Sequence, residues 1–554
     1  MFCCPTLASA ADMPIVPPPV LWSWTGFYIG GHVGAGFGSS QFSNSAGAAI
    51  YGGTVRSPAA VGGAQVGYNW QIPNSLVVLG AEADASALGA DGTATCFASS
   101  GFFVSSNCQA RPDATGSLTG RLGLVTGPRG HTLIYVKGGA AWLDERIAIT
   151  SNAFYPAVST SFDGVRWGWT LGAGLEKALT PAWSLRLEYD YANFGAAGLA
   201  TPPGAGQAFP PSIFGLFATP GGSTNVSQNL QTVKLGLNYK LGVDPEAQWE
   251  PADYHLRGTT DVPYVPDAEI EIGGRVWYSS GRFQKDLAAT ASQPQPNLLG
   301  SRLTYDSSAA TGELFGRVDT AMNIFIKGFI GGGKILSGNM HDEDWLIATG
   351  PLTAVPYSNT VSSVDGDLAY GTFDVGYSLF RGPSSNVGGF IGFNYFRENK
   401  QAFGCTQIAN PYSDCVPAIP NSILGITEDD KWYSFRVGLN GVVTVADRLK
   451  LTADVAYLPL VAFRGTDDHL LRTDVPNTVS PEAGNGQGVQ LEAILSYAVS
   501  DAFNIGAGGR YWAMWAPGTY TNIFSTPCPC QAMPVRTERY GAFLQASYKM
   551  DGLK

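Results

Sequence analysis

Apolar side chains alternate with glycine and polar residues along many segments of this chain. From Val165 to Glu176 every odd position is apolar, and the even positions carry Arg, Gly, Thr or Glu. The same alternation recurs from Trp183 to Tyr191 and from Val233 to Leu241. A period of two is that of a β-strand, in which successive side chains point to opposite faces. We therefore expect an all-β chain.

The residues between the apolar positions distinguish a membrane barrel from a soluble sandwich. The polar face of a sandwich would carry more charge, whereas Gly dominates that face here. Of 554 residues, 70 are Gly and only 14% are charged, against about 25% charged in a typical soluble domain. This pattern fits a transmembrane β-barrel with a lipid-facing surface and a polar lumen.

Two other classes are excluded by charge and hydropathy. No uninterrupted apolar run reaches the roughly 18 residues that a spanning helix needs, so helical membrane spans are excluded. The 33 basic and 44 acidic residues give a net charge of -11. Such a chain offers no basic surface for a phosphate backbone, which excludes nucleic acid as a partner.

Eight alternating segments precede residue 243. They lie near residues 24–38, 61–71, 75–87, 115–127, 131–147, 163–178, 181–194 and 228–242. An even number of strands returns the chain to the side of the membrane where it started. The run from Trp22 to Gly31 and the run from Gln231 to Lys240 resemble the first and last strands of small eight-stranded, OmpA-type outer-membrane barrels. The resemblance covers residues 22–242 and implies a barrel of eight strands.

Residues 243–267 differ from both flanks, because prolines alternate there with acidic residues and no period-two pattern is present. This composition indicates a linker that is too long for a periplasmic hairpin turn. Ten more alternating segments follow. They lie near residues 269–282, 299–319, 322–338, 364–381, 386–402, 431–445, 448–463, 486–499, 502–518 and 534–550. The sequence therefore predicts two tandem transmembrane antiparallel β-barrels, at 22–242 and 268–554, rather than one eighteen-stranded barrel.

Residues 1–21 indicate export. Leu7 to Asp12 end in the small-x-small pattern of a signal-peptidase site, and we interpret them as the tail of a signal peptide that starts further upstream. An ordinary cytosolic N-terminus is the alternative. Pro14 to Pro19 form a stiff, extended, Pro-rich tether. Export and the barrel pattern together predict an integral protein of the cell outer membrane.

Four cysteines are spaced for local disulfides. Cys96 and Cys108 lie in one loop-like segment, and Cys405 and Cys415 lie in another. Each pair could close a loop in an oxidising compartment. Metal ligation is the rival interpretation, but neither segment has the further His or Cys at ligand spacing that a metal needs. We expect disulfides and no metal.

Two of the five histidines lie in acidic clusters. Asp342 and Asp344 follow His341 after the third strand of the second barrel, and Asp467 with His469 follow the seventh. Odd-numbered strands end on the extracellular side, where the connections are long. Strands three and seven of a ten-stranded ring are nearly opposite, so the two clusters could face each other across the mouth. A solvated acidic rim that repels anions or binds divalent cations is the alternative.

These clusters resemble those of the omptins, the ten-stranded outer-membrane endopeptidases. Asp342 to Trp345 is similar to their Asp-x-Asp-Trp segment, and Asp467 to His469 matches their Asp-x-His pair in the corresponding strand. The resemblance covers about residues 269–550 and includes the segments 301–305 and 325–328. It implies an aspartic-type endopeptidase that needs no cofactor and takes lipopolysaccharide as an activator.

The resemblance also implies a role for each of the four side chains. Asp467 would orient His469, and His469 would take a proton from water. Asp342 and Asp344 would hold that water against the peptide carbonyl. A carboxylate beside an imidazole makes the ring a better base, and such general-base catalysis contributes roughly 10²–10⁴ in rate. Two carboxylates one residue apart repel, so one pKa of the pair should rise.

Two departures from the omptin pattern concern specificity and strand parity. Gly465 and Lys285 stand where the family carries acidic pocket residues, so a preference for basic substrates is not implied. Asp467 and His469 share their parity with Val455, Tyr457 and Phe463, which look lipid-facing. We therefore expect a β-bulge near Pro459 that turns the dyad inward.

Arg397 and Lys431 resemble the basic residues with which the family grips lipid A phosphates, and we expect them to bind lipopolysaccharide. The predicted function is hydrolysis of extracellular peptides or proteins at the mouth of the second barrel. The alternative is a non-enzymatic structural or adhesion protein of the porin-type small-barrel class with a vestigial acidic rim. A solute channel is disfavoured, because side chains largely fill barrels of eight and ten strands.

Overall fold

The computed structural model describes most of the chain between residues 22 and 551. The described ranges are 22–44, 53–99, 104–151, 157–202, 204–207, 216–219, 221–243, 268–288, 298–345, 357–382, 384–409, 414–522 and 531–551. The expected signal-peptide remnant, the Pro-rich tether and nearly all of the expected linker at 243–267 lie outside these residues. In the part of the chain described, no helix is long and apolar enough to cross a membrane.

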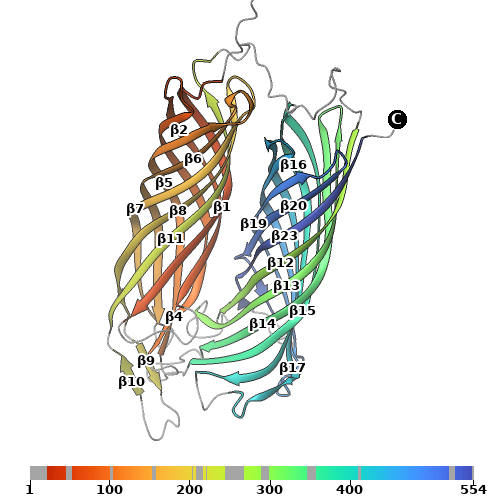
Figure 1. Ribbon diagram of the computed structural model, residues 1–554. Coiled ribbons are helices and arrows are strands. Elements are labelled where there is room, and N and C mark those ends of the chain that lie inside the picture. Colours follow the sequence, from red (N-terminus) through yellow and green to blue (C-terminus); the bar gives the residue numbers. More distant parts are fainter. Residues whose placement is uncertain are drawn as a thin grey trace, which may run out of the picture.

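The first sheet closes into a barrel of eight antiparallel strands (Figure 1). In ring order these are β1 (Gly26–Asn44), β2 (Thr54–Gln71), β3 (Val77–Ala90), β5 (Val104–Thr126), β6 (Thr132–Ser151), β7 (Val158–Ala178), β8 (Trp183–Thr201) and β11 (Gly222–Lys240). Pairing of β1 with both β2 and β11 closes the ring. Closure leaves no free sheet edge, so every strand can pair its backbone groups on both sides. A strand in lipid needs this pairing, because no water is there to replace it.

The second sheet closes in the same way into a barrel of ten strands. These are β12 (Ala268–Ala288), β13 (Leu299–Thr320), β14 (Ile324–Trp345), β15 (Tyr357–Gly382), β16 (Ser385–Gln407), β17 (Ile419–Ala446), β18 (Leu449–His469), β19 (Val479–Ala498), β20 (Phe503–Ala516) and β23 (Val535–Asp551). Pairing of β12 with β13 and β23 closes the ring. The predicted all-β fold of eight and then ten strands is confirmed.

Several strands are longer than the alternating segments, and short strands add to their ends. The short elements are β4 (Gly92–Ser99), the 3-10 turn η1 (Pro128–Gly130), β9 (Gly204–Gln207), β10 (Leu216–Thr219), β21 (Tyr520–Thr521) and β22 (Gln531–Ala532). The strand β4 continues β3 and pairs with β5. Cys96 and Cys108 were expected in a loop, but they lie on the paired strands β4 and β5. These strands form a β-hairpin that extends beyond the barrel wall.

The two faces of the wall have opposite chemistry. Large apolar side chains point outward, such as Trp167 (70% exposed) and Leu314 (68% exposed). Charged side chains fill the interior, such as Arg186 and Glu82, which are 0% and 1% exposed. This is the arrangement of a membrane barrel, with lipid outside and a polar lumen inside.

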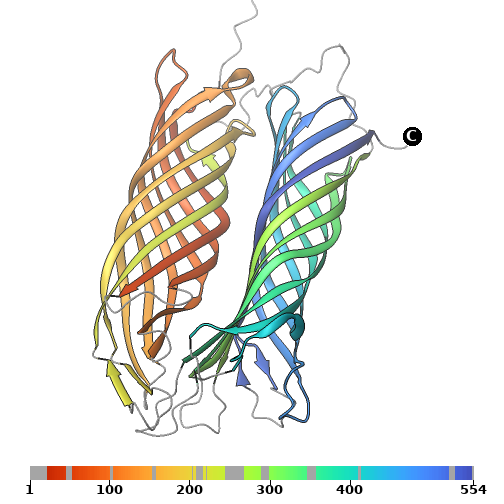
Figure 2. The ribbon, with the colours of Figure 1, turned by 60° about the horizontal axis from the view of Figure 1, so that its bottom comes forward.

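The two barrels lie side by side, and their outer faces are in contact (Figures 1 and 2). The Phe37 ring lies 4.3 Å from the Tyr511 ring, measured between centroids. Leu185 of β8 packs onto Gly441 of β17, where an added Cβ would come within 2.8 Å of the Leu185 side chain. Glycine at this position therefore lets the two walls approach closely.

Candidate functional site

The four predicted catalytic side chains line one cavity at the end of the second barrel that carries the long connections. The cavity has a volume of about 410 Å³, and Asp342, Asp344, Asp467 and His469 all border it. Asp342 and Asp344 come from the end of β14, and the other two come from the end of β18. The structure thus brings together two clusters that are more than a hundred residues apart.

A bulge in β18 turns the Asp467–His469 pair toward the lumen. The register with β19 shifts between Leu458 and Val461, on either side of Pro459. Tyr457 is 41% exposed before the bulge, whereas Phe463 is 0% exposed after it. The expected bulge near Pro459 is confirmed, and the expectation that Phe463 faces lipid is wrong because the bulge reverses its parity.

A second bulge, in β14, was not expected from the sequence. The register with β15 shifts between Ile335 and Asn339. Before the bulge, even-numbered residues such as Ile330 face outward. After the bulge, even-numbered residues such as Met340 face the lumen. Without this extra residue Asp342 and Asp344 would point away from the cavity.

The imidazole of His469 is held by a carboxylate and lies above the apolar band. His469 Nε2 lies 3.0 Å from Asp467 Oδ2. The last exposed large apolar residue of β18 is Leu460, nearer the membrane. Burial acts to lower the pKa of His469, but the Asp467 carboxylate outweighs it and raises the pKa above the ordinary 6.5. The charged ring is therefore favoured.

Asp467 has two cationic neighbours. Lys285 Nζ lies 2.9 Å from Asp467 Oδ2, the oxygen that also faces His469. Burial acts to raise the pKa of Asp467, but the ammonium of Lys285 and the imidazole together hold it well below its usual range. Asp467 is therefore an anion that can orient the ring at any ordinary pH.

The carboxyl groups of Asp342 and Asp344 behave as a pair. Burial and the neighbouring Asp344 charge raise the pKa of Asp342 to about 8, against an opposing effect of His469. Burial also raises the pKa of Asp344. Near neutral pH the pair therefore holds a proton, as expected for two carboxyl groups that share one site.

An acidic cluster below the dyad was missed in the sequence. Glu428 of β17 and Glu482 of β19 join Asp467, with oxygen atoms within 4.8 Å of one another. Lys285 Nζ contacts Glu428 Oε2 at 2.5 Å and Glu482 Oε1 at 2.8 Å. The three carboxylates could hold a metal ion by their spacing, but the Lys285 ammonium lies among them. The sequence marks this cluster only through Glu428 and Asp430, two acidic residues at alternating positions of one strand.

A disulfide and a cation border the outer part of the cavity. Cys405 on β16 is bonded to Cys415, and both residues line the cavity. Arg472 also lines it and makes a two-point contact with Asp474, with both nitrogen–oxygen distances at 2.6 Å. The wall of the cavity therefore includes a disulfide bond and a guanidinium that pairs with Asp474.

Arg397 and Lys431 are neighbours on the wall of the second barrel. They are directly opposite each other across β16 and β17. Both contact Asp429, at 2.7 Å from Arg397 Nε and at 2.8 Å from Lys431 Nζ. Their side chains are 29% and 36% exposed. The pair forms a partly neutralised basic patch, apart from the cavity.

Two closed rings with apolar outer faces and charged interiors define the class of outer-membrane β-barrel proteins. Residues 6–240 match the family described as the outer membrane protein beta-barrel domain. The 31 kDa outer-membrane immunogenic proteins of Brucella melitensis and Brucella suis are each 32% identical over 249 residues, which cover 43% of this chain and 94% of theirs. The chain belongs to this outer-membrane β-barrel family, and the predicted location is confirmed.

Solved structures provide weaker likenesses. The outer-membrane protease OmpT from Escherichia coli is 15% identical, with a TM-score of 0.44, and the match covers 53% of this chain and 100% of that one. The Ail protein of Yersinia pestis is 14% identical, with a TM-score of 0.19, and the match covers 39% and 98%. At these scores neither likeness carries an argument about activity.

Proposed function

We propose that the second barrel is an outer-membrane endopeptidase of omptin type, whose mouth hydrolyses peptide bonds with an activated water. The observation that carries the proposal is the meeting of the Asp467–His469 dyad and the Asp342–Asp344 pair around one cavity. A cavity of about 410 Å³ lies within the size range of small-molecule sites. A peptide side chain and its scissile bond could enter it.

Each group has a role that follows from its protonation. His469 Nε2 donates to Asp467, so the ring would take the proton of the water at Nδ1. His469 must be neutral to do so, and Asp467 then stabilises the imidazolium that forms. The proton held by Asp342 and Asp344 would position the water or the substrate carbonyl. Neither step requires a metal or another cofactor.

Lipopolysaccharide is the proposed lipid partner of this barrel. Arg397 and Lys431 form the patch that would contact its phosphates, and extracellular peptides or proteins would be the substrates. Because Lys285 already lies among Glu428, Asp467 and Glu482, those acids are not available to select a basic substrate side chain. We therefore propose no dibasic specificity.

The second candidate is a non-enzymatic surface protein. The comparisons with known proteins support this candidate better, because the Brucella relatives are named as immunogens and the family match carries no activity. That family match covers residues 6–240, the first barrel. The geometry of the second barrel supports the endopeptidase, so the two candidates draw on different halves of the chain.

A cleavage assay separates these candidates. The refolded full chain with lipopolysaccharide is incubated with a mixed peptide library, and products are read by mass spectrometry. We expect the wild type to cleave and His469→Ala to lose roughly 10²–10⁴ of the rate. His341→Ala is the matched control, because it removes an imidazole from the same rim outside the dyad and the carboxyl pair.

Each outcome decides between the candidates. No cleavage by any correctly folded version supports the surface protein. Equal cleavage by wild type and His469→Ala would identify a contaminating peptidase and would rule out the proposed catalytic site. Heat-modifiable migration on a gel checks that each variant has formed its barrels.

A further inference from the structure

The hairpin of β4 and β5 extends from the first barrel to the strand that carries Asp342 and Asp344. The strand β4 lies at the end of the first barrel that faces the end of β14 (Figure 1). Thr95 on β4 donates to Glu343 Oε1 on β14 at 2.6 Å. Glu343 stands between the two site aspartates in sequence. Because successive side chains of a strand point to opposite faces, Glu343 lies outside the barrel while its neighbours face the cavity.

A buried guanidinium completes this contact. Arg302 of β13 is the cross-strand partner of Glu343. Arg302 Nη1 donates to Thr95 Oγ1 at 3.1 Å, and Arg302 Nη2 donates to Asn107 Oδ1 at 2.6 Å. Thr95, Arg302 and Glu343 are 2%, 1% and 0% exposed. Within the second barrel, Tyr357 also donates to Glu343 Oε1 at 2.6 Å, and the Trp345 ring lies over Arg302. The first barrel supplies the rest of the contact through Thr95 and Asn107.

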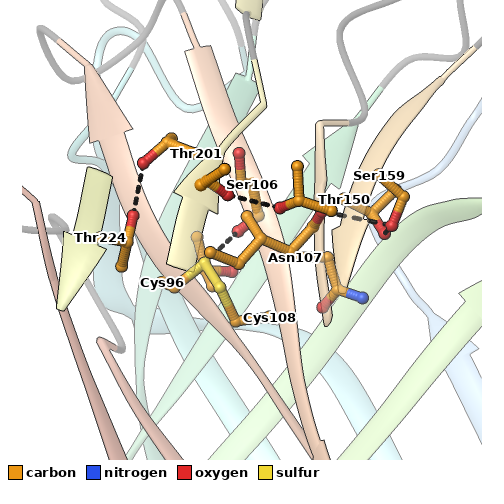
Figure 3. The surroundings of a disulfide bond; sticks show 12 residues. Cys96, Ser106, Asn107, Cys108, Thr150, Ser159, Thr201 and Thr224 are labelled. Carbon is orange, nitrogen blue, oxygen red and sulfur yellow. Dashed lines mark hydrogen bonds between the residues drawn. A yellow bond between two sulfur atoms is a disulfide. The ribbon is translucent and has the colours of Figure 1, made fainter. Parts of the chain in front are cut away.

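The hairpin residues are themselves fixed. Thr95 and Asn107 are directly opposite each other on β4 and β5, so both side chains face Arg302. The next residue after each is a cysteine, and Cys96 is bonded to Cys108 (Figure 3). Both cysteines are buried, at 1% and 0% exposed. The disulfide therefore holds together the two strands that present the contact.

A second set of bonds extends the contact to β12. Thr93 donates to Asp286 Oδ2 at 2.5 Å, and Arg302 Nε donates to Asp286 Oδ1 at 2.7 Å. Arg536 of β23 also pairs with Asp286, at 3.1 Å. The hairpin thus joins β12, β13 and β14, which together form one side of the proposed catalytic mouth.

We propose that this disulfide-stapled hairpin of the first barrel positions the carboxyl pair of the second, with Thr95 and Asn107 as positioning residues. The proposal rests on the proposed function for its catalytic part. Holding Glu343 from outside fixes where Asp342 and Asp344 stand inside. A displacement of about 1 Å in a catalytic group can cost on the order of 10²-fold in rate. The first barrel would then be a required part of the site rather than a separate envelope element.

The test uses an isosteric change at a residue that does not line the cavity. Thr95→Val keeps the shape of the side chain and removes its hydroxyl, and Thr95→Ser restores a hydroxyl. Thr150→Val is the matched control, because Thr150 lies on the same barrel and, among the described residues, its hydroxyl bonds to Ser159 of that barrel at 3.0 Å (Figure 3). Hydrogen exchange of the β14 amides near residues 339–345 and peptide kinetics are measured on the full chain.

We expect Thr95→Val to speed exchange at the end of β14 and to lower kcat about 5- to 100-fold with little change in KM. Thr95→Ser should recover most of the loss, and Thr150→Val should match the wild type in both measurements. Unchanged exchange in Thr95→Val would overturn the proposal. Faster exchange with unchanged kcat would overturn the positioning role. Faster exchange in a chain whose wild type cleaves nothing would confirm the contact and reject the proposed function.

Discussion

The two barrels use buried charge in opposite ways. In the first lumen, Glu82 contacts Arg186 at 2.5 Å, Lys137 at 3.3 Å and the Tyr28 hydroxyl at 2.7 Å. Five buried acids of this network share four buried cations, and every one of the five carboxylates lies within 4.0 Å of a cation. At the mouth of the second barrel, carboxyl groups outnumber their cations and surround a cavity. Carboxylates that each pair with a cation fill the first lumen, whereas Asp342 and Asp344 border a cavity, and the raised pKa of Asp342 leaves the pair with a proton near neutral pH.

The largest expected difference between the two barrels is in how much one substitution of a buried carboxylate lowers the free energy of unfolding. Glu82→Gln removes the countercharge of Arg186 and Lys137, and breaking one member of a buried network costs about 3–5 kcal/mol. Burial and the charge of Glu428 raise the pKa of Glu482 well above its usual range, so Glu482→Gln replaces a carboxyl that is readily protonated. We expect that change to cost about 1 kcal/mol. Denaturant unfolding in detergent measures both, and equal losses would contradict the contrast.

The pH dependence of cleavage is the next largest effect. Activity should rise with pH as His469 loses its proton, at a pKa above 6.5. It should fall again near pH 8, where the Asp342–Asp344 pair loses its proton. Each limb changes the rate about tenfold per pH unit. Asp342→Asn should remove the falling limb while leaving the rising limb in place. A single rising limb in the wild type would show that the shared proton has no role.

The smallest effect concerns the outer surface. Arg397→Gln with Lys431→Gln should weaken lipopolysaccharide binding, by about 1 kcal/mol or less per charge, because both side chains are partly exposed and already share Asp429. Arg146→Gln is the control on the first barrel, where Arg146 is 60% exposed between Asp113 and Asp163. Binding to lipopolysaccharide micelles at low and high salt measures both. Equal weakening by the two changes would assign the binding to net charge rather than to the patch.

The strands could be predicted from the sequence because their signal is local. Alternation over about ten residues records which face meets lipid, and every predicted segment overlaps a strand of one of the two rings. Sequence alternation could not distinguish lipid from a neighbouring protein wall. Val455 looks lipid-facing and does point outward, yet it is 4% exposed because the first barrel covers it.

The site could be predicted only in part. Asp342, Asp344, Asp467 and His469 form two short clusters at strand ends, so local patterns single them out. Lys285, Glu428 and Glu482 meet from β12, β17 and β19. The alternating acids at Glu428 and Asp430 mark one member of this cluster but do not indicate which residues of the other strands join it. The inward orientation of Asp342 depends on a bulge of one residue in β14, which period-two reasoning does not detect.

The contact of Leu185 with Gly441 has a consequence for how the protein moves in its bilayer. Lipid tails are as apolar as leucine, so water expulsion does not hold two walls together at this depth, and only their fit does. Gly441, which has no side chain, leaves the space that Leu185 fills. Two barrels joined in this way would diffuse and tilt in the bilayer as one rigid unit. A single methyl group added at position 441 could separate the two walls and admit lipid between them.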